Sequence, residues 1–139
     1  MKHEQALTLT PKKSSSIVSF KGYWQNELNS NMVLRVRGNN LTGRYTSLVS
    51  SSGKTVSGPI SGYVNGHTLA FVVKWPTPSI TAWVGQLVRE NRRDVIQTLW
   101  QLTSEIDNPG DPTELWNSIN SGAATFTRAR GPRKRKRAK

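Results

Sequence analysis

The sequence lacks several features on which protein chemistry commonly depends. It contains no cysteine, so disulfides and thiolate metal sites are excluded. Its two histidines, His3 and His67, are far apart and do not have a metal-ligand spacing. No His–carboxylate–nucleophile set, paired-carboxylate motif or phosphate-binding loop is present, so the sequence does not predict an enzyme.

Long apolar segments are also missing. No apolar run approaches the roughly 20 residues of a membrane span, so no membrane contact is expected. Residues 1–20 contain lysines but no apolar stretch typical of a secretory signal. The amino terminus therefore gives no indication of export.

Positive charge is abundant but unevenly distributed. The formal net charge is +12, yet residues 21–127 carry nearly equal numbers of basic and acidic side chains. Residues 128–139 are rich in Lys and Arg and contain no acidic residue. The sequence thus predicts a nearly neutral body with a basic tail. That tail either contacts a polyanion, acts as a localisation signal or is simply a solvated terminus.

The length of 139 residues fits one domain with a substantial core. We expect a flexible N-terminal segment over residues 1–20, a folded domain over 21–130 and a basic, disordered tail over 131–139. Short alternating runs separated by turn residues predict strands at residues 22–26, 31–38, 40–47, 57–65, 68–75, 79–90, 93–103 and 123–130. Residues 113–116 are expected to form one helical turn. Eight hairpin-linked strands favour an all-β fold, an eight-stranded antiparallel up-and-down β-barrel.

The alternation of residues in the strands also predicts what faces the barrel interior. In residues 79–87, Ser79, Thr81 and Trp83 share one face. Applied to every strand, the same parity gathers polar and aromatic residues near one end of the barrel: Asn26, Ser30, Tyr45, Ser47, Trp75, Ser79, Thr81, Trp83 and Trp100. Buried polar groups need partners, so this set predicts a cavity for a neutral, hydrogen-bonding ligand. The alternative for residues 79–87 alone is an ordinary half-buried strand.

Six short motifs occur in a consistent order between Gly22 and Thr127. They are Gly22-Tyr23-Trp24-Gln25-Asn26-Glu27-Leu28-Asn29-Ser30, Leu41-Thr42-Gly43-Arg44-Tyr45, Ile60-Ser61-Gly62, Thr81-Ala82-Trp83-Val84-Gly85-Gln86, Thr98-Leu99-Trp100-Gln101-Leu102, and Trp116-Asn117-Ser118 followed by Thr125-Phe126-Thr127. Each is weak alone. Together they resemble the avidin/streptavidin family.

The resemblance implies non-covalent biotin binding, a homo-oligomer that is usually a tetramer, and an extracellular location. It implies hydrogen bonds from Asn26, Ser30 and Tyr45 to the ureido oxygen of biotin and from one ureido N–H to Ser47. The other contacts are implied position by position. Thr81 would contact the ring sulfur, and Ser79 with the backbone near Ser51 would hold the carboxylate, with Thr77 as a helper. The bicyclic ring would be surrounded by Trp75, Trp83, Trp100, Leu28, Val49 and Leu102, and Trp116 would cover the biotin of the neighbouring subunit. Trp24 is expected to close the far end of the barrel instead.

Three positions depart from the family pattern. Ala124 occupies the place where the family has an Asp or Asn that accepts from the second ureido N–H, so biotin binding is expected to be weaker. Asn29 replaces a glycine but tolerates positive φ better than most residues. The connection from Trp75 to Ser79 is short and proline-rich, which leaves the carboxylate contacts open. The alternative function is a basic-tailed barrel that binds nucleic acid or another small ligand.

Overall fold

The computed structural model describes residues 1–9, 18–49 and 54–131. Its elements in chain order are α1 His3–Thr8, β1 Gly22–Asn26, β2 Asn31–Arg37, β3 Asn40–Val49, β4 Lys54–Asn65, β5 Thr68–Lys74, β6 Ser79–Glu90, β7 Arg93–Ser104, α2 Pro112–Asn117 and β8 Ile119–Arg128. No helix in these ranges is long and apolar enough to cross a membrane.

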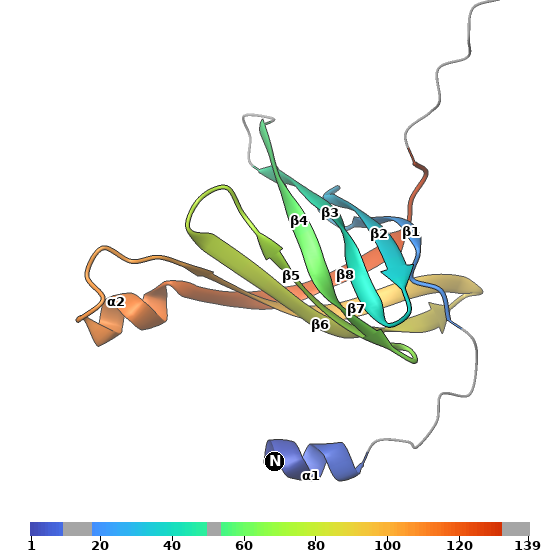
Figure 1. Ribbon diagram of the computed structural model, residues 1–139, viewed down its shortest axis with the longest axis horizontal. Coiled ribbons are helices and arrows are strands. Elements are labelled where there is room, and N and C mark those ends of the chain that lie inside the picture. Colours follow the sequence, from blue (N-terminus) through green and yellow to red (C-terminus); the bar gives the residue numbers. More distant parts are fainter. Residues whose placement is uncertain (10–17, 50–53, 132–139) are drawn as a thin grey trace, which may run out of the picture.

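The eight strands form a closed barrel in which each strand pairs with its neighbours in sequence and β8 returns to β1 (Figure 1). All pairings are antiparallel, which confirms the predicted up-and-down barrel. The residues of β5 alternate between exposed and buried along the whole strand, as a barrel wall requires. The pairing of β1 with β8 is short, with three register pairs, whereas β6 and β7 pair along their full lengths.

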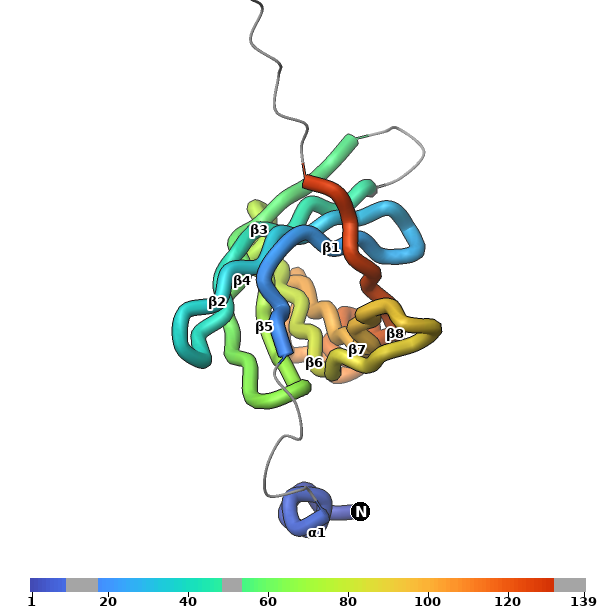
Figure 2. Tube along the Cα trace, turned by 90° about the vertical axis from the view of Figure 1, so that its right-hand side faces the viewer, coloured from blue at the N-terminus to red at the C-terminus, as the bar shows by residue number. Residues whose placement is uncertain are grey.

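The barrel has two different ends. We call the "α2 end" the one that carries α2 and the connections β1–β2, β3–β4, β5–β6 and β7–β8. The "closed end" carries the turns β2–β3, β4–β5 and β6–β7, and it faces the viewer in Figure 2. Phe20 and Trp24 are fully or almost fully buried there, and Trp24 Nε1 donates to the Phe20 carbonyl over 2.8 Å. Trp24 therefore closes this end, as expected from the sequence.

Several boundaries differ from the sequence-based expectation. Strand β8 begins at Ile119, four residues earlier than predicted, because residues after α2 already pair with β7 through Thr103 and Ile119. The helical turn extends to Pro112–Asn117, with Asp111 as N-cap accepting from the amides of Thr113 and Glu114. Within residues 1–20, expected to be flexible, the structure forms α1 and buries Phe20. The three domain limits stay predictions, and residues 132–139 lie outside the described residues.

Candidate functional site

Three of the predicted polar side chains meet at the α2 end of the barrel. Asn26 Nδ2 donates to the Tyr45 hydroxyl over 3.1 Å, and Ser30 also hydrogen-bonds to that hydroxyl. The Asn26 amide oxygen accepts from the backbone N–H groups of Leu28 and Ser30, which fixes its orientation. Ser30 and Tyr45 are buried, at 3% and 4% exposure. We call Asn26, Ser30 and Tyr45 the polar cluster.

The β1–β2 turn holds the polar cluster in place. Asn29 has a φ of 64°, in the left-handed region that Asn tolerates better than most residues. Its side-chain oxygen accepts from Gln25 Nε2 over 3.0 Å. The replacement of glycine by asparagine is therefore compatible with this turn, as the sequence suggested.

An aromatic stack lies against the polar cluster. The Tyr45 and Trp83 rings stack with centroids 4.8 Å apart, and Trp83 stacks in turn on Phe71 at 4.9 Å. The ring of Trp75 meets Tyr45 edge-on at 5.8 Å, and Phe126 does so at 6.2 Å. These contacts hold the Tyr45 ring on three sides, so its hydroxyl has a fixed position.

Trp75, directly after β5, and the predicted residues of β6 and β7 continue this wall. Trp75 Nε1 donates to Thr81 Oγ1 over 2.9 Å, and the Thr81 side chain is buried. Trp83 and Thr81 are directly opposite Trp100 and Leu102 in the β6–β7 ladder. Nearer the rim, Ser79 Oγ and Thr77 Oγ1 share a hydrogen bond of 2.9 Å. Ser47, Trp75, Ser79, Trp100 and Leu102 are half-buried, and so border the entrance.

Two predicted residues do not join this wall. Leu28 is 72% exposed and Trp116, on α2, is 69% exposed. Neither side chain packs into the barrel to which it belongs, and the expected contact of Leu28 with the bicyclic ring of biotin stays a prediction. The Val49 side chain and Ser51 lie outside the described part of the structure.

Burial changes the acidity of the central tyrosine. Desolvation raises the pKa of Tyr45 to about 12, helped by the negative charge of Glu27, while the hydrogen bonds with Ser30 and Asn26 act in the opposite direction. The phenol therefore stays protonated throughout the physiological range. It can donate a hydrogen bond to a neutral or partly anionic acceptor.

Position 124 offers no polar side chain to this cavity. Ala124 is 5% exposed, lies on the inner face of β8 and is paired with Thr98 of β7. Thr98 is also buried, and its hydroxyl donates to the Ala124 carbonyl over 2.8 Å. An alcohol oxygen that donates one hydrogen bond keeps acceptor capacity. On the adjacent strand β7, the side-chain acceptor paired with position 124 is therefore the Thr98 hydroxyl.

Residues outside the predicted set also support the site. Phe71 and Phe126 contact the aromatic stack, and Glu27 Oε2 accepts from the backbone N–H of Thr125. The strand alternation had already placed Phe71 and Phe126 inside the barrel, but it gave no sign of which rings would touch. The link between Glu27 and Thr125 joins β8 to the β1–β2 turn, a pairing that only barrel closure reveals.

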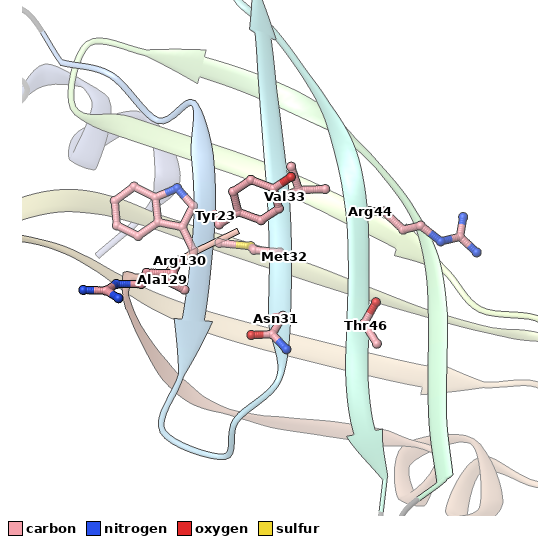
Figure 3. Close-up of a pocket in the computed structure, with 9 residues that line it drawn as sticks. Tyr23, Asn31, Met32, Val33, Arg44, Thr46, Ala129 and Arg130 are labelled. Atoms are coloured by element: carbon pink, nitrogen blue, oxygen red, sulfur yellow. The ribbon is translucent and has the colours of Figure 1, made fainter. Parts of the chain in front are cut away.

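Three hollows of the structure lie away from the polar cluster. One, of about 310 Å³, is on the outer wall beside β1 and β2 (Figure 3). It is lined in part by Tyr23, Val33, Arg44 and Arg130. Another is beside Val18 and Phe20, and the third lies along the β6–β7 hairpin at the closed end. None of the three contains a residue of the predicted biotin set.

The site as built is uncharged and rich in hydrogen-bonding groups. Its amide, hydroxyl and phenol converge beside stacked aromatic rings, the arrangement that suits a small, neutral, partly apolar ligand. Among the described residues, no group of three His, Cys, Asp or Glu could hold a metal ion. Fold and site together define a small-ligand-binding β-barrel.

Comparison with known proteins identifies the kind of barrel. Residues 14–129 match the Avidin family, and the chain belongs to that family. Avidin of Gallus gallus is 31% identical over 134 residues, covering 88% of this chain and 86% of avidin. The crystal structure of xenavidin superposes with a TM-score of 0.68 at 30% identity, over 79% of this chain and 97% of xenavidin. The rhizavidin–biotin complex gives a TM-score of 0.68 at 28% identity, over 86% and 100% of the two chains.

Membership of this family supports biotin binding at the level of the family. It also agrees with the sequence-based expectation that the chain is a binding protein rather than an enzyme.

Proposed function

We propose that the protein binds biotin non-covalently at the α2 end of its barrel, one molecule per chain. The observation that carries this proposal is the polar cluster, in which Asn26, Ser30 and Tyr45 converge within a buried aromatic frame. It is supported by the match to a solved rhizavidin–biotin complex. In this proposal the three side chains donate to the ureido oxygen. Convergent donors favour the anionic character that this oxygen then gains.

The remaining contacts follow the positions of the side chains. Ser47 accepts from one ureido N–H, Thr81 contacts the ring sulfur, and Ser79 with Thr77 holds the carboxylate at the rim. Trp75, Trp83, Trp100 and Leu102 enclose the bicyclic ring. Since the Tyr45 hydroxyl already accepts a hydrogen bond from Asn26 Nδ2, its own proton is directed to the ligand in this proposal. The contributions of Val49 and Ser51 remain predictions.

The absence of a polar side chain at position 124 weakens this binding. One ureido N–H loses the side-chain acceptor that an Asp or Asn would supply there. An unsatisfied buried donor costs about 1–3 kcal/mol. The Thr98 hydroxyl can recover part of this cost, because it lies on the strand facing Ala124 and keeps acceptor capacity.

Titration calorimetry and thermal unfolding test the proposal. Biotin in excess should release heat with a stoichiometry of one per chain and raise the melting temperature, because a ligand bound only to the folded state stabilises it. Tyr45→Phe removes a single oxygen from the polar cluster and should weaken binding by about 5- to 150-fold. Tyr63→Phe is the matched control, because Tyr63 is 68% exposed. No heat and no thermal shift with the unmodified chain would refute biotin binding.

We further propose that the chain forms a homotetramer in which Trp116 covers the biotin of a neighbouring subunit. Trp116 stands 69% exposed on α2 beside the mouth of the barrel. A cross-strand row of Tyr63, Ala70, Val84, Leu99 and Ala123 also runs over the outside of five strands. Val84 and Leu99 in this row are 59% and 65% exposed. A contiguous apolar surface of this kind suits contact with a second copy of the chain.

The basic tail supports one more proposal, contact with a polyanion. The last described residues lead away from the candidate site, because the Ala129 amide donates to the Tyr23 carbonyl near the closed end and Gly131 packs on the Tyr23 ring. The basic residues that follow are outside the described residues.

A further inference from the structure

The charges of the barrel are separated between its two ends. Most of the acidic side chains are at the α2 end: Glu27, Glu105, Asp107, Asp111 and Glu114, alongside Lys54 and Lys74. The closed end and the adjoining termini of the barrel carry Lys21, Arg35, Arg37, Arg89, Arg92, Arg93, Arg128 and Arg130, with Glu90 and Asp94. The folded body is nearly neutral in total charge, but its charges are separated between the two ends. We call the closed end the basic pole, and it lies opposite the proposed biotin site.

A groove crosses this basic pole. It has a volume of about 460 Å³ and is lined by Arg89, Arg92, Arg93, Asp94, Thr127 and Arg128. These residues belong to the β6–β7 hairpin and to the end of β8, which lie side by side in Figure 2. The chain leaves β8 toward its basic tail from the edge of the same groove.

The two carboxylates at this pole are already engaged within the protein. Asp94 Oδ2 lies 3.5 Å from Arg128 Nη2, and Glu90 Oε1 accepts from Gln97 Nε2. Arg128 also donates to the carbonyls of Ser19 and Lys21 and lies 4.1 Å above the Trp24 ring. Arg128 is thus a structural residue that neutralises Asp94, which leaves that carboxylate less able to neutralise the outer arginines of the groove.

Arg92 and Arg93 lie at a tight turn. Asn91 and Arg92 both have positive φ values, of 49° and 65°, which define a tight two-residue connection between β6 and β7. Arg89 Nη2 braces it by donating to the Arg92 carbonyl over 3.3 Å. The side chains of Arg92 and Arg93 are exposed, and neither forms an ion pair with a carboxylate of the described residues.

We propose that the closed end is a second binding surface, which takes the phosphate backbone of a nucleic acid independently of base sequence. Arginine predominates at this pole, and its planar guanidinium matches phosphate oxygens in a two-point contact. The acidic α2 end repels the same polyanion, so the molecule docks with its biotin site facing away. The turns at the closed end consist of Gly, Asn, His and Arg, so they present no large apolar side chain to insert into a lipid layer.

The test compares two double variants of the full chain. Arg92→Gln/Arg93→Gln removes two positive charges from the groove. Lys54→Gln/Lys74→Gln removes two from exposed positions at the α2 end. Arginine and glutamine are both unbranched at Cβ, so the substitution should not change how readily residue 92 adopts the positive φ of this turn. Circular dichroism melting checks folding without relying on biotin.

Binding of a fluorescent DNA duplex of arbitrary sequence is followed by anisotropy over a range of salt concentrations. We expect the groove variant to lower the slope of log affinity against log salt by about 2, because each phosphate that an arginine neutralises contributes about 0.9 to that slope. The control pair should leave the slope unchanged. Biotin affinity should be the same in both variants, and a failure of the unmodified chain to bind biotin would bear on the proposed function alone.

The other outcomes overturn the proposal. Equal weakening by both pairs would show an effect of net charge without a site. If neither double variant changed the salt slope of DNA binding, that binding would belong to the tail or to no surface of the chain. If Arg92→Gln/Arg93→Gln lost binding to vesicles of anionic phospholipid but kept its DNA binding, the partner of the groove would be a lipid surface and not a nucleic acid.

Discussion

Replacement of Ala124 by aspartate is the most direct probe of how this barrel holds its ligand. Ala124 is 5% exposed on the inner face of β8, two residues before the buried Phe126, so a longer side chain there points into the cavity. A carboxylate at this position would accept the second ureido N–H of biotin. We therefore expect Ala124→Asp to slow the release of biotin.

The size of the effect depends on what already faces that N–H. A fully unsatisfied buried donor costs about 1–3 kcal/mol, or roughly 5- to 150-fold in affinity. The Thr98 hydroxyl donates to the Ala124 carbonyl and can still accept a hydrogen bond, so it offsets part of the loss. We expect a gain in the lower half of that range. It should appear in the off-rate, because diffusional encounter is unaltered.

The same substitution should destabilise the protein without ligand. A carboxylate at a site that is 5% exposed loses hydration, and no basic side chain lies opposite it in the β7–β8 ladder. The melting temperature should therefore fall without biotin and recover with it. A lower melting temperature without biotin combined with slower biotin release would show that the new carboxylate acts as an acceptor for the ligand and does not simply stabilise the fold.

The assay follows dissociation of labelled biotin after addition of excess unlabelled biotin. Ser121→Asp is the control, since the Ser121 side chain lies on the outer face of β8, is exposed and is not part of the apolar row proposed to contact another subunit. Thr98→Val combined with Ala124→Asp asks whether the hydroxyl supplies the compensation. Unchanged or faster release from Ala124→Asp, with the fold intact, would mean that another group already accepts from this N–H or that β8 is misaligned with the family.

Three further predictions concern other parts of the chain. Burial raises the pKa of Tyr45 from 10.0 to about 12, because the folded protein disfavours the phenolate. The unfolded chain therefore ionises first, and the free energy of unfolding should fall by about 3 kcal/mol as the pH rises from 10 toward 12, with no effect of this group below pH 10. Chemical denaturation should show this fall in the unmodified chain but not in Tyr45→Phe. Trp116→Ala should speed biotin release without changing the melting temperature of the unliganded protein, and light scattering that gives a monomer mass at micromolar concentration would contradict the tetramer. Deletion of residues 131–139 should sharply reduce retention on heparin and leave biotin binding intact, and loss of biotin binding would show that the tail belongs to the site.

Strand alternation was enough to predict the fold class and much of the candidate wall. The limits of β1 and β6 were predicted correctly because turn residues precede or follow these strands. The parity argument also gathered Asn26 and Tyr45, which do bond. These features are local, so they can be read from one strand at a time.

The features that sequence reasoning missed depend on contacts between distant segments. Residues 119–122 show no alternation, and they become strand because β7 offers partners and Gly122 packs on Trp100, where a Cβ would lie 2.6 Å from Cζ2. The stacking of Tyr45 on Trp83 joins β3 to β6. The exposure of Leu28 depends on the β1–β2 turn, whose shape the motif alone does not determine.

The short pairing between β1 and β8 bears on how the barrel folds. Every other strand pair joins neighbours in sequence, whereas this one joins the first strand to the last and therefore carries the highest loop-closure entropy. We expect the hairpins to form early and this seam to close last, with Arg128 tying β8 to the segment before β1. Asn26 lies on the seam, opposite Phe126. A chain emerging from the ribosome therefore cannot capture its ligand until its final strand has been synthesised, so binding reports completion of the whole barrel.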